Sequence, residues 1–120
     1  NNYLKEISHK SFEIDYWGLS AKKSLKKILT FEKNKNVINI AVASWLPLER
    51  SINLLDKDER KRINIVYGNF QSADYLYTNF MSEIDKNFDN KYEIPSNFTM
   101  VDEFIVDNIK VYEVFKKNNN

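Results

Sequence analysis

Residues 37–43 read Val37-Ile38-Asn39-Ile40-Ala41-Val42-Ala43, and this stretch decides the fold class. Ile38, Ile40 and Val42 alternate on one side of an extended chain, while Asn39 and small residues occupy the other. A strand with so few groups that need water is typical of the centre of a sheet that is covered on both faces. The stretch therefore predicts a central strand in an α/β domain.

A strand and a long helix are expected ahead of this central strand. Residues 11–16 alternate apolar and polar side chains, as a half-buried strand does. Gly18 interrupts the alternation, and Ser20 is a favourable N-cap for the helix that follows. Apolar residues then recur with the spacing of one helix face: Ala21, Leu25, Ile28 and Leu29. We expect this stripe to face the sheet.

Shorter helices and further strands are expected after the central strand. Pro47 is well placed to begin a helix that runs through Leu55. Residues 56–59 have the form of a capping box, which would begin a short helix that ends near Arg62. Four later segments have strand patterns: residues 63–67, 73–79, 98–106 and 109–115.

Asp107-Asn108 separates the last two of these strands. Both residue types tolerate a positive φ, so a two-residue hairpin turn is expected there. The order of elements predicts one α/β domain with a mixed β-sheet, two main helices and a C-terminal antiparallel hairpin. We expect residues 1–120 to form this single domain, with an ordered core of about residues 11–116.

Composition excludes several classes of protein. The chain has 120 residues with 18 basic and 17 acidic side chains, so no strong positive field would draw it onto nucleic acid. It has no cysteine, which removes thiol catalysis and thiolate metal sites. His9 is the single histidine, and the sequence contains no nucleophile elbow, phosphate loop or dinucleotide fingerprint. We therefore expect no catalytic residues, no metal and no cofactor.

One edge of the expected sheet is where a ligand would bind. In open α/β sheets, ligands bind beyond the carboxyl ends of parallel strands, where helix N-termini also point. If the strands that end near positions 16, 43 and 78 are parallel, their ends bring together Trp17, Ser20, Ser44, Trp45 and Asn79. Such a rim suits a phosphate or the hydroxyls of a sugar. The alternative is that both tryptophans belong to the core and that the rim only faces a partner.

The expected long helix carries four lysines, Lys22, Lys23, Lys26 and Lys27. They lie outside its apolar stripe, so the simplest interpretation is a solvated helix face. The alternative is a surface for phosphate groups or for an anionic membrane, where each basic group contributes roughly 1 kcal/mol.

Five short motifs occur along the chain in a familiar order. They are Phe12-Glu13-Ile14-Asp15-Tyr16-Trp17-Gly18-Leu19-Ser20, Lys23-Ser24-Leu25, Lys61-Arg62-Ile63, Ala73-Asp74-Tyr75-Leu76-Tyr77-Thr78-Asn79-Phe80 and the hairpin of residues 104–116. This arrangement resembles the soluble C-terminal domains of bacterial multispanning glycosyltransferases, the family 39 and dolichyl-phosphate-mannose mannosyltransferase-like enzymes. The resemblance spans residues 12–116. Asn108 stands where similar domains usually have glycine, and Phe115 where they have tyrosine.

The resemblance implies a membrane enzyme that moves a sugar from a polyprenyl-phosphate donor to an acceptor on the periplasmic side of the bacterial inner membrane. The catalytic acid of that family lies between early transmembrane helices, and no position here corresponds to it. The chain would be a non-catalytic extracytoplasmic domain excised from a longer membrane protein. Its partner would be the transmembrane part of the same parent chain, and a lipid-linked sugar or a glycan acceptor would be a candidate ligand.

Two other classes stay open at this point. A free-standing small-ligand-binding α/β domain fits the expected fold, although the sequence has no Gly-rich phosphate loop. A protein-interaction module in a larger assembly also fits. About ten or more transmembrane segments upstream in the parent gene would favour the glycosyltransferase, whereas a soluble parent would exclude it.

Overall fold

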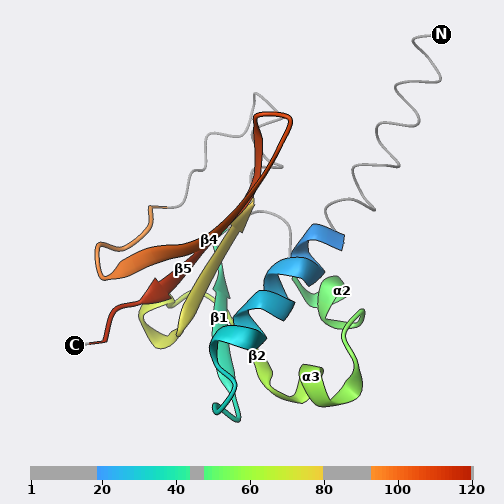
Figure 1. Cartoon of the computed structure of the whole chain (residues 1–120). Helices are drawn as coiled ribbons and strands as arrows, with labels where there is room; N and C mark the ends of the chain where they lie inside the picture. The colour runs from blue at the N-terminus through green and yellow to red at the C-terminus, as the bar shows by residue number, and fades with distance from the viewer. Residues whose placement is uncertain (1–18, 44–47, 80–92, 120) are drawn as a thin grey trace, which may run out of the picture.

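The computed structural model describes residues 19–43, 48–79 and 93–119 of the chain (Figure 1). Five strands form one mixed sheet in the order β2-β1-β3-β5-β4. The strands are β1 Ile38–Val42, β2 Ile63–Val66, β3 Tyr75–Asn79, β4 Phe98–Val106 and β5 Ile109–Lys117. β1 pairs in parallel with both β2 and β3, whereas β5 is antiparallel to both β3 and β4. The expected α/β domain with a mixed sheet and a C-terminal antiparallel hairpin is confirmed.

One long helix packs on one face of this sheet. Residues 19–31 are helical, and in Figure 1 this segment, blue to cyan, lies across the strands. The expected apolar stripe is buried, and it joins side chains from β1, β3 and β5 in one core cluster. The members from the helix and from the first two of these strands are Ala21, Leu25, Ile28, Leu29, Ile38, Ile40, Tyr75 and Tyr77. The prediction that the stripe faces the sheet is confirmed.

The opposite face of the sheet has a second, smaller core cluster. It contains Ala41, Ala73, Leu76 and Phe98 as buried members. Ile40 and Ala41 are neighbours in β1, and each has an exposed fraction of 0% although they face opposite sides. β1 is therefore a central strand that is covered on both faces, as residues 37–43 predict.

The shorter helices follow the expected order but differ in length. α2 covers Glu49–Ile52, a single turn within the predicted helix from Pro47 to Leu55. Its N-cap, Leu48, has no side-chain acceptor for the free N–H groups of the first turn, so nothing local extends the helix. α3 covers Lys57–Lys61 and begins with the predicted capping box, in which Glu59 N–H donates to Asp56 Oδ1 at 3.0 Å and Asp56 N–H donates to Glu59 Oε1 at 3.2 Å.

Ser20 is not the N-cap that the sequence suggests. It lies inside the helical segment, because Leu19 before it is already helical. Ser20 is also buried, so burial within the fold outweighs its preference for a cap position. The strand expected over residues 11–16 and the break at Gly18 lie outside the described residues.

The C-terminal hairpin has the tight turn expected at Asp107-Asn108. Both residues have positive φ, 50° for Asp107 and 64° for Asn108, as a type I′ turn requires. β4 also has irregular register between Met100 and Asp102 and again between Phe104 and Ile105. Such bulges increase the local twist of a strand, and β4 is the outermost strand of the sheet.

Candidate functional site

The predicted ligand rim lies at the edge where β1 and β3 end. The parallel pairing of these strands is confirmed, and Ala43 N–H, just after β1, donates to the carbonyl of Tyr77 in β3 at 2.8 Å. Of the five predicted rim residues, Trp17, Ser44 and Trp45 lie outside the described residues. Ser20 and Asn79 are described, with exposed fractions of 4% and 5%. These two polar side chains are therefore buried, and the rim as a whole stays a prediction.

Tyr77 is the notable side chain near this edge. Its hydroxyl is buried, and no hydrogen bond of good geometry joins it to a described residue. Burial raises the pKa of the Tyr77 phenol to about 12, while the neighbouring Asn79 side chain acts in the opposite direction. The phenol therefore stays neutral at ordinary pH, and Tyr77 serves the core of the domain.

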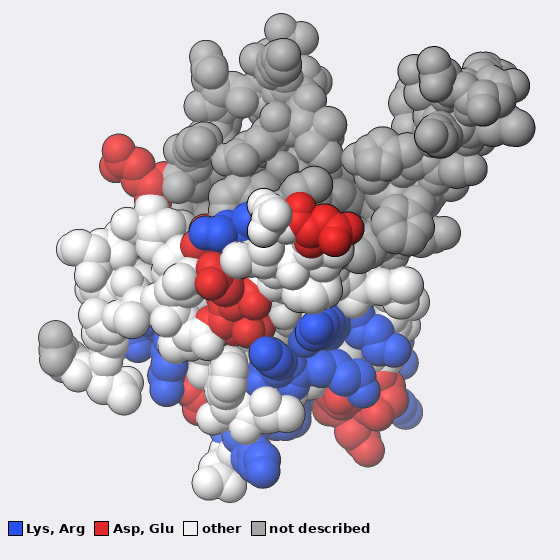
Figure 2. Space-filling model, turned by 45° about the horizontal axis from the view of Figure 1, so that its top comes forward, with Lys and Arg blue, Asp and Glu red and all other residues white. Residues whose placement is uncertain are grey.

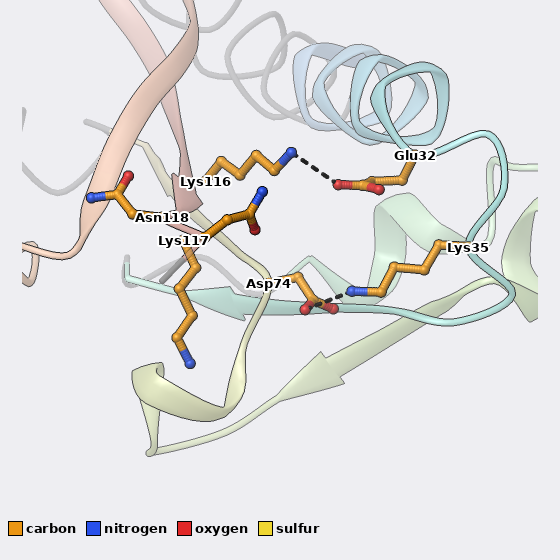
Figure 3. Close-up of a pocket in the computed structure, with 7 residues that line it drawn as sticks. Glu32, Lys35, Asp74, Lys116, Lys117 and Asn118 are labelled. Atoms are coloured by element: carbon orange, nitrogen blue, oxygen red, sulfur yellow. Dashed lines mark ion pairs between the residues drawn. The ribbon is translucent and has the colours of Figure 1, made fainter.

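A charged hollow lies at the opposite edge, where β1 and β3 begin and β5 ends. Its volume is about 240 Å³, and it is lined by Glu32, Lys35, Asp74, Lys116, Lys117, Asn118 and Asn119. Figure 3 shows Lys116 and Lys35 reaching toward Glu32 and Asp74 from different elements. We call these seven residues the charged hollow.

Both carboxylates of the charged hollow accept a hydrogen bond from a neutral donor of the fold and pair with a lysine. Glu32 Oε1 accepts a hydrogen bond from the buried Tyr75 hydroxyl at 2.8 Å, and Lys116 Nζ lies 3.3 Å from the same oxygen. Asp74 Oδ2 accepts from the Asn39 backbone N–H at 2.9 Å, and Asp74 Oδ1 lies 2.8 Å from Lys35 Nζ. Each carboxylate thus joins one uncharged donor of the core to one lysine at the surface.

Arg62 lies beside the hollow and binds the segment that follows the long helix. Its guanidinium donates to the carbonyls of Glu32 and Lys35, the latter at 3.1 Å from Nε. Both carbonyls come just after the helical segment, which ends at residue 31. Arg62 thus fixes the backbone that carries Glu32 and Lys35.

The lysines of the long helix hold neighbouring elements instead of forming one free basic surface. On one flank, Lys26 Nζ lies 3.3 Å from Glu59 of α3. On the other, Lys27 Nζ lies 3.0 Å from Asp102 Oδ1 of β4, and Lys23 Nζ lies 3.9 Å from the ring centroid of Phe104. Figure 2 shows acidic side chains directly beside the basic ones on this face.

Asp102 is the centre of the contact between the long helix and the hairpin. Only 8% of its side chain is exposed, and its Oδ2 accepts a hydrogen bond from the Tyr112 hydroxyl at 2.9 Å. Burial, and then the Asp102 hydrogen bond, raise the pKa of the Tyr112 phenol well above its usual value. The same two causes, with Glu32 as acceptor, raise the pKa of Tyr75.

The sequence gives only weak signals for the charged hollow. Its residues come from the end of the long helix, the start of β3 and the end of β5, so the sheet topology is needed to bring them together. One usable signal was Asp74, a carboxylate directly before an otherwise apolar strand. A charged group in that position usually has a partner.

Two further properties bear on chemistry. In residues 19–43, 48–79 and 93–119, no three His, Cys, Asp or Glu side chains gather as a metal site would need. None of the helices described for the chain is long and apolar enough to cross a bilayer.

The chain was compared with known proteins at three levels. No protein-family model, no curated protein sequence and no solved structure matched it. No relative therefore supplies a function for this chain.

Proposed function

We propose that this chain is a non-catalytic extracytoplasmic domain of a polyprenyl-phosphate-sugar-dependent membrane glycosyltransferase. Its role would be to support the membrane part of the same parent chain or to shape the access of the acceptor. The proposal is supported by the sequence motifs that resemble such domains and by the contacts that polar residues of those motifs make.

One observation carries the proposal: three polar side chains of the described motifs, those of Arg62, Asp74 and Tyr75, are engaged in holding the fold. Arg62, of the Lys61-Arg62-Ile63 motif, donates to the carbonyls at the end of the long helix. Asp74 and Tyr75, of the motif at β3, bind the Asn39 N–H and the Glu32 carboxylate. A motif of a catalytic domain would instead direct such groups toward a substrate.

These contacts suggest that the motifs shared with such domains maintain the fold. Together Arg62, Asp74 and Tyr75 join the end of the long helix to the beginning of β1 and β3. A scaffold of this kind suits an accessory role beside a membrane-embedded active site. In the proposed protein, the catalytic acid belongs to the transmembrane part.

Fractionation of the source cells tests the proposal. An antibody raised against residues 1–120 should detect a membrane-bound polypeptide that is much larger than this chain. In spheroplasts, protease added from outside should cleave the epitope, while a cytoplasmic marker protein stays intact. A band of about the size of this chain in the soluble fraction would contradict the proposal and favour a free-standing binding or interaction module.

An activity assay tests the non-catalytic part of the proposal separately. The purified chain is expected to fold but to transfer no sugar from a polyprenyl-phosphate donor, compared with a control without protein. Transfer by the chain alone would show that the polar groups of its motifs do more than hold the fold.

A further inference from the structure

We propose that the charged hollow binds a small oxyanion, that is, a phosphate, sulfate or carboxylate group. The hollow lies at the edge where β1 and β3 begin, away from the edge where the sequence predicts a ligand rim. The proposal uses the side chains of the hollow and the neighbouring Arg62, and it does not depend on the proposed function.

Hydrogen-bond donors outnumber acceptors in the hollow. Lys35 and Lys116 each carry three N–H donors, and each contacts one acceptor among the described residues. Lys117 is directed away from these two amines (Figure 3), and its Nζ donates to the Gln71 carbonyl. Glu32 and Asp74 each already accept from one neutral donor and pair with one lysine. A ligand that fills the hollow must therefore mainly accept hydrogen bonds.

The charges of the hollow also favour an anion. Its three lysines and two carboxylates give a net charge of +1, and Arg62 beside it adds one more positive charge. Arg62 donates to the carbonyls of Glu32 and Lys35, just after the long helix, so these two acceptors are already satisfied. The lysines are reachable, because Lys35 and Lys116 are 44% and 39% exposed.

The size of the hollow limits the ligand. Its volume of about 240 Å³ lies below the roughly 300–1,000 Å³ of pockets that hold drug-sized molecules. An oxyanion of one charged group fits this volume. The two fixed carboxylates keep the amines of Lys35 and Lys116 in place before the anion arrives, which reduces the entropy lost on binding.

The lysines of the long helix are a weaker candidate for the same ligand. Lys26 and Lys27 are directed to different neighbours, Glu59 and Asp102, on opposite flanks of the helix. They do not share one space, whereas Lys35 and Lys116 both line the hollow.

Nuclear magnetic resonance of the ¹⁵N-labelled chain tests the proposal. Inorganic phosphate is titrated against potassium chloride at matched ionic strength, and amide shifts are mapped on the sequence. We expect saturating shifts centred on Lys35, Asp74 and residues 116–119. Parallel titrations with sulfate, acetate and glycerol phosphate then compare the affinities of the hollow for these different oxyanions.

Charge variants give the specific control. Lys35→Gln and Lys116→Gln should each weaken phosphate binding about five- to thirtyfold, the loss of one charge-assisted hydrogen bond. Lys57→Gln removes the same charge from exposed α3, outside the hollow, and should leave binding unchanged. The fold of each variant is checked by the dispersion of its amide spectrum.

Three results would overturn the proposal: shifts that never saturate in the millimolar range, shifts centred on other residues, or equal weakening by Lys57→Gln. If a variant of the hollow fails to fold, the amide shifts of the unmodified chain during the phosphate titration still test the proposal. A membrane location or a soluble one leaves these titrations unchanged, so their failure is separate from that of the proposed function.

Discussion

Asp102 offers a direct test of how the hairpin is attached to the long helix. Asp102→Ala removes the acceptor of the Tyr112 hydroxyl and the partner of Lys27. Tyr112 has an exposed fraction of 0%, so its hydroxyl loses a hydrogen bond with little access to water. A buried donor left in this state costs about 1–3 kcal/mol. Lys27 is 49% exposed and can be hydrated, so its lost ion pair adds at most about 1 kcal/mol.

Asp102→Ala is therefore expected to lower the free energy of unfolding by about 1–4 kcal/mol. The assay is urea denaturation followed by far-ultraviolet circular dichroism, with linear extrapolation to water. Lys27→Ala is the matched control, because it breaks the same ion pair from the exposed side. It should cost less than Asp102→Ala, because the Asp102 carboxylate keeps its hydrogen bond from the Tyr112 hydroxyl.

The two variants differ in what they leave buried, and this difference refutes or supports the reasoning. If Asp102→Ala and Lys27→Ala lower stability equally, the Tyr112 hydrogen bond contributes nothing beyond the surface ion pair. A loss below about 1 kcal/mol for Asp102→Ala would have the same meaning. Tyr112→Phe completes the cycle, because in that background Asp102→Ala should lose most of its effect.

Three further changes test other parts of the fold. Asn108→Gly should leave the melting temperature unchanged or raise it, whereas Asn108→Val should lower it, because φ at this position is 64° and a β-branched residue resists that region; equal melting temperatures would contradict the turn geometry. Asp56→Ala removes the capping box of α3 and should cost about 1 kcal/mol in urea denaturation, and no measurable loss would mean that α3 is held by packing alone. Tyr75, Tyr77 and Tyr112 have pKa values raised by burial, so they stay protonated in the folded chain above pH 10 while the unfolded chain releases their protons. Stability should then be fully present below about pH 10 and fall as pH rises, by about 1.4 kcal/mol per pH unit for each phenol. The phenolate absorbance of these three of the seven tyrosines should appear only with unfolding; formation of all seven phenolates well before unfolding would refute the assignment.

The fold was largely predictable because local patterns and long-range packing agree. Residues 37–43 and the apolar stripe of the long helix each bury the side chains that their periodicity marks. The capping box at Asp56 and the turn at Asp107-Asn108 depend on contacts within a few residues, which the sequence displays directly. The length of α2 was less predictable, because no capping side chain marks where that helix begins.

The site was harder to predict because it depends on contacts between distant segments. Glu32, Asp74 and Lys116 meet only after β3 has paired with β5. Each of them alone reads as an ordinary surface charge. Ser20 shows the opposite case, since a residue typical of a helix cap lies inside the helix and is buried within the fold.

The strand order has a consequence for the speed of folding. β4 and β5 are joined by a two-residue turn, so the hairpin can form on the microsecond scale from local contacts. β1 and β3 must close a loop of more than thirty residues before their parallel pairing begins, as the register of Ile40 with Tyr75 shows. The slow step should therefore be the parallel pairing of β1 with β3, after the hairpin has formed. In a chevron experiment, substitutions in β1 should then slow refolding, whereas substitutions at the hairpin turn should act through the earlier equilibrium that forms the hairpin.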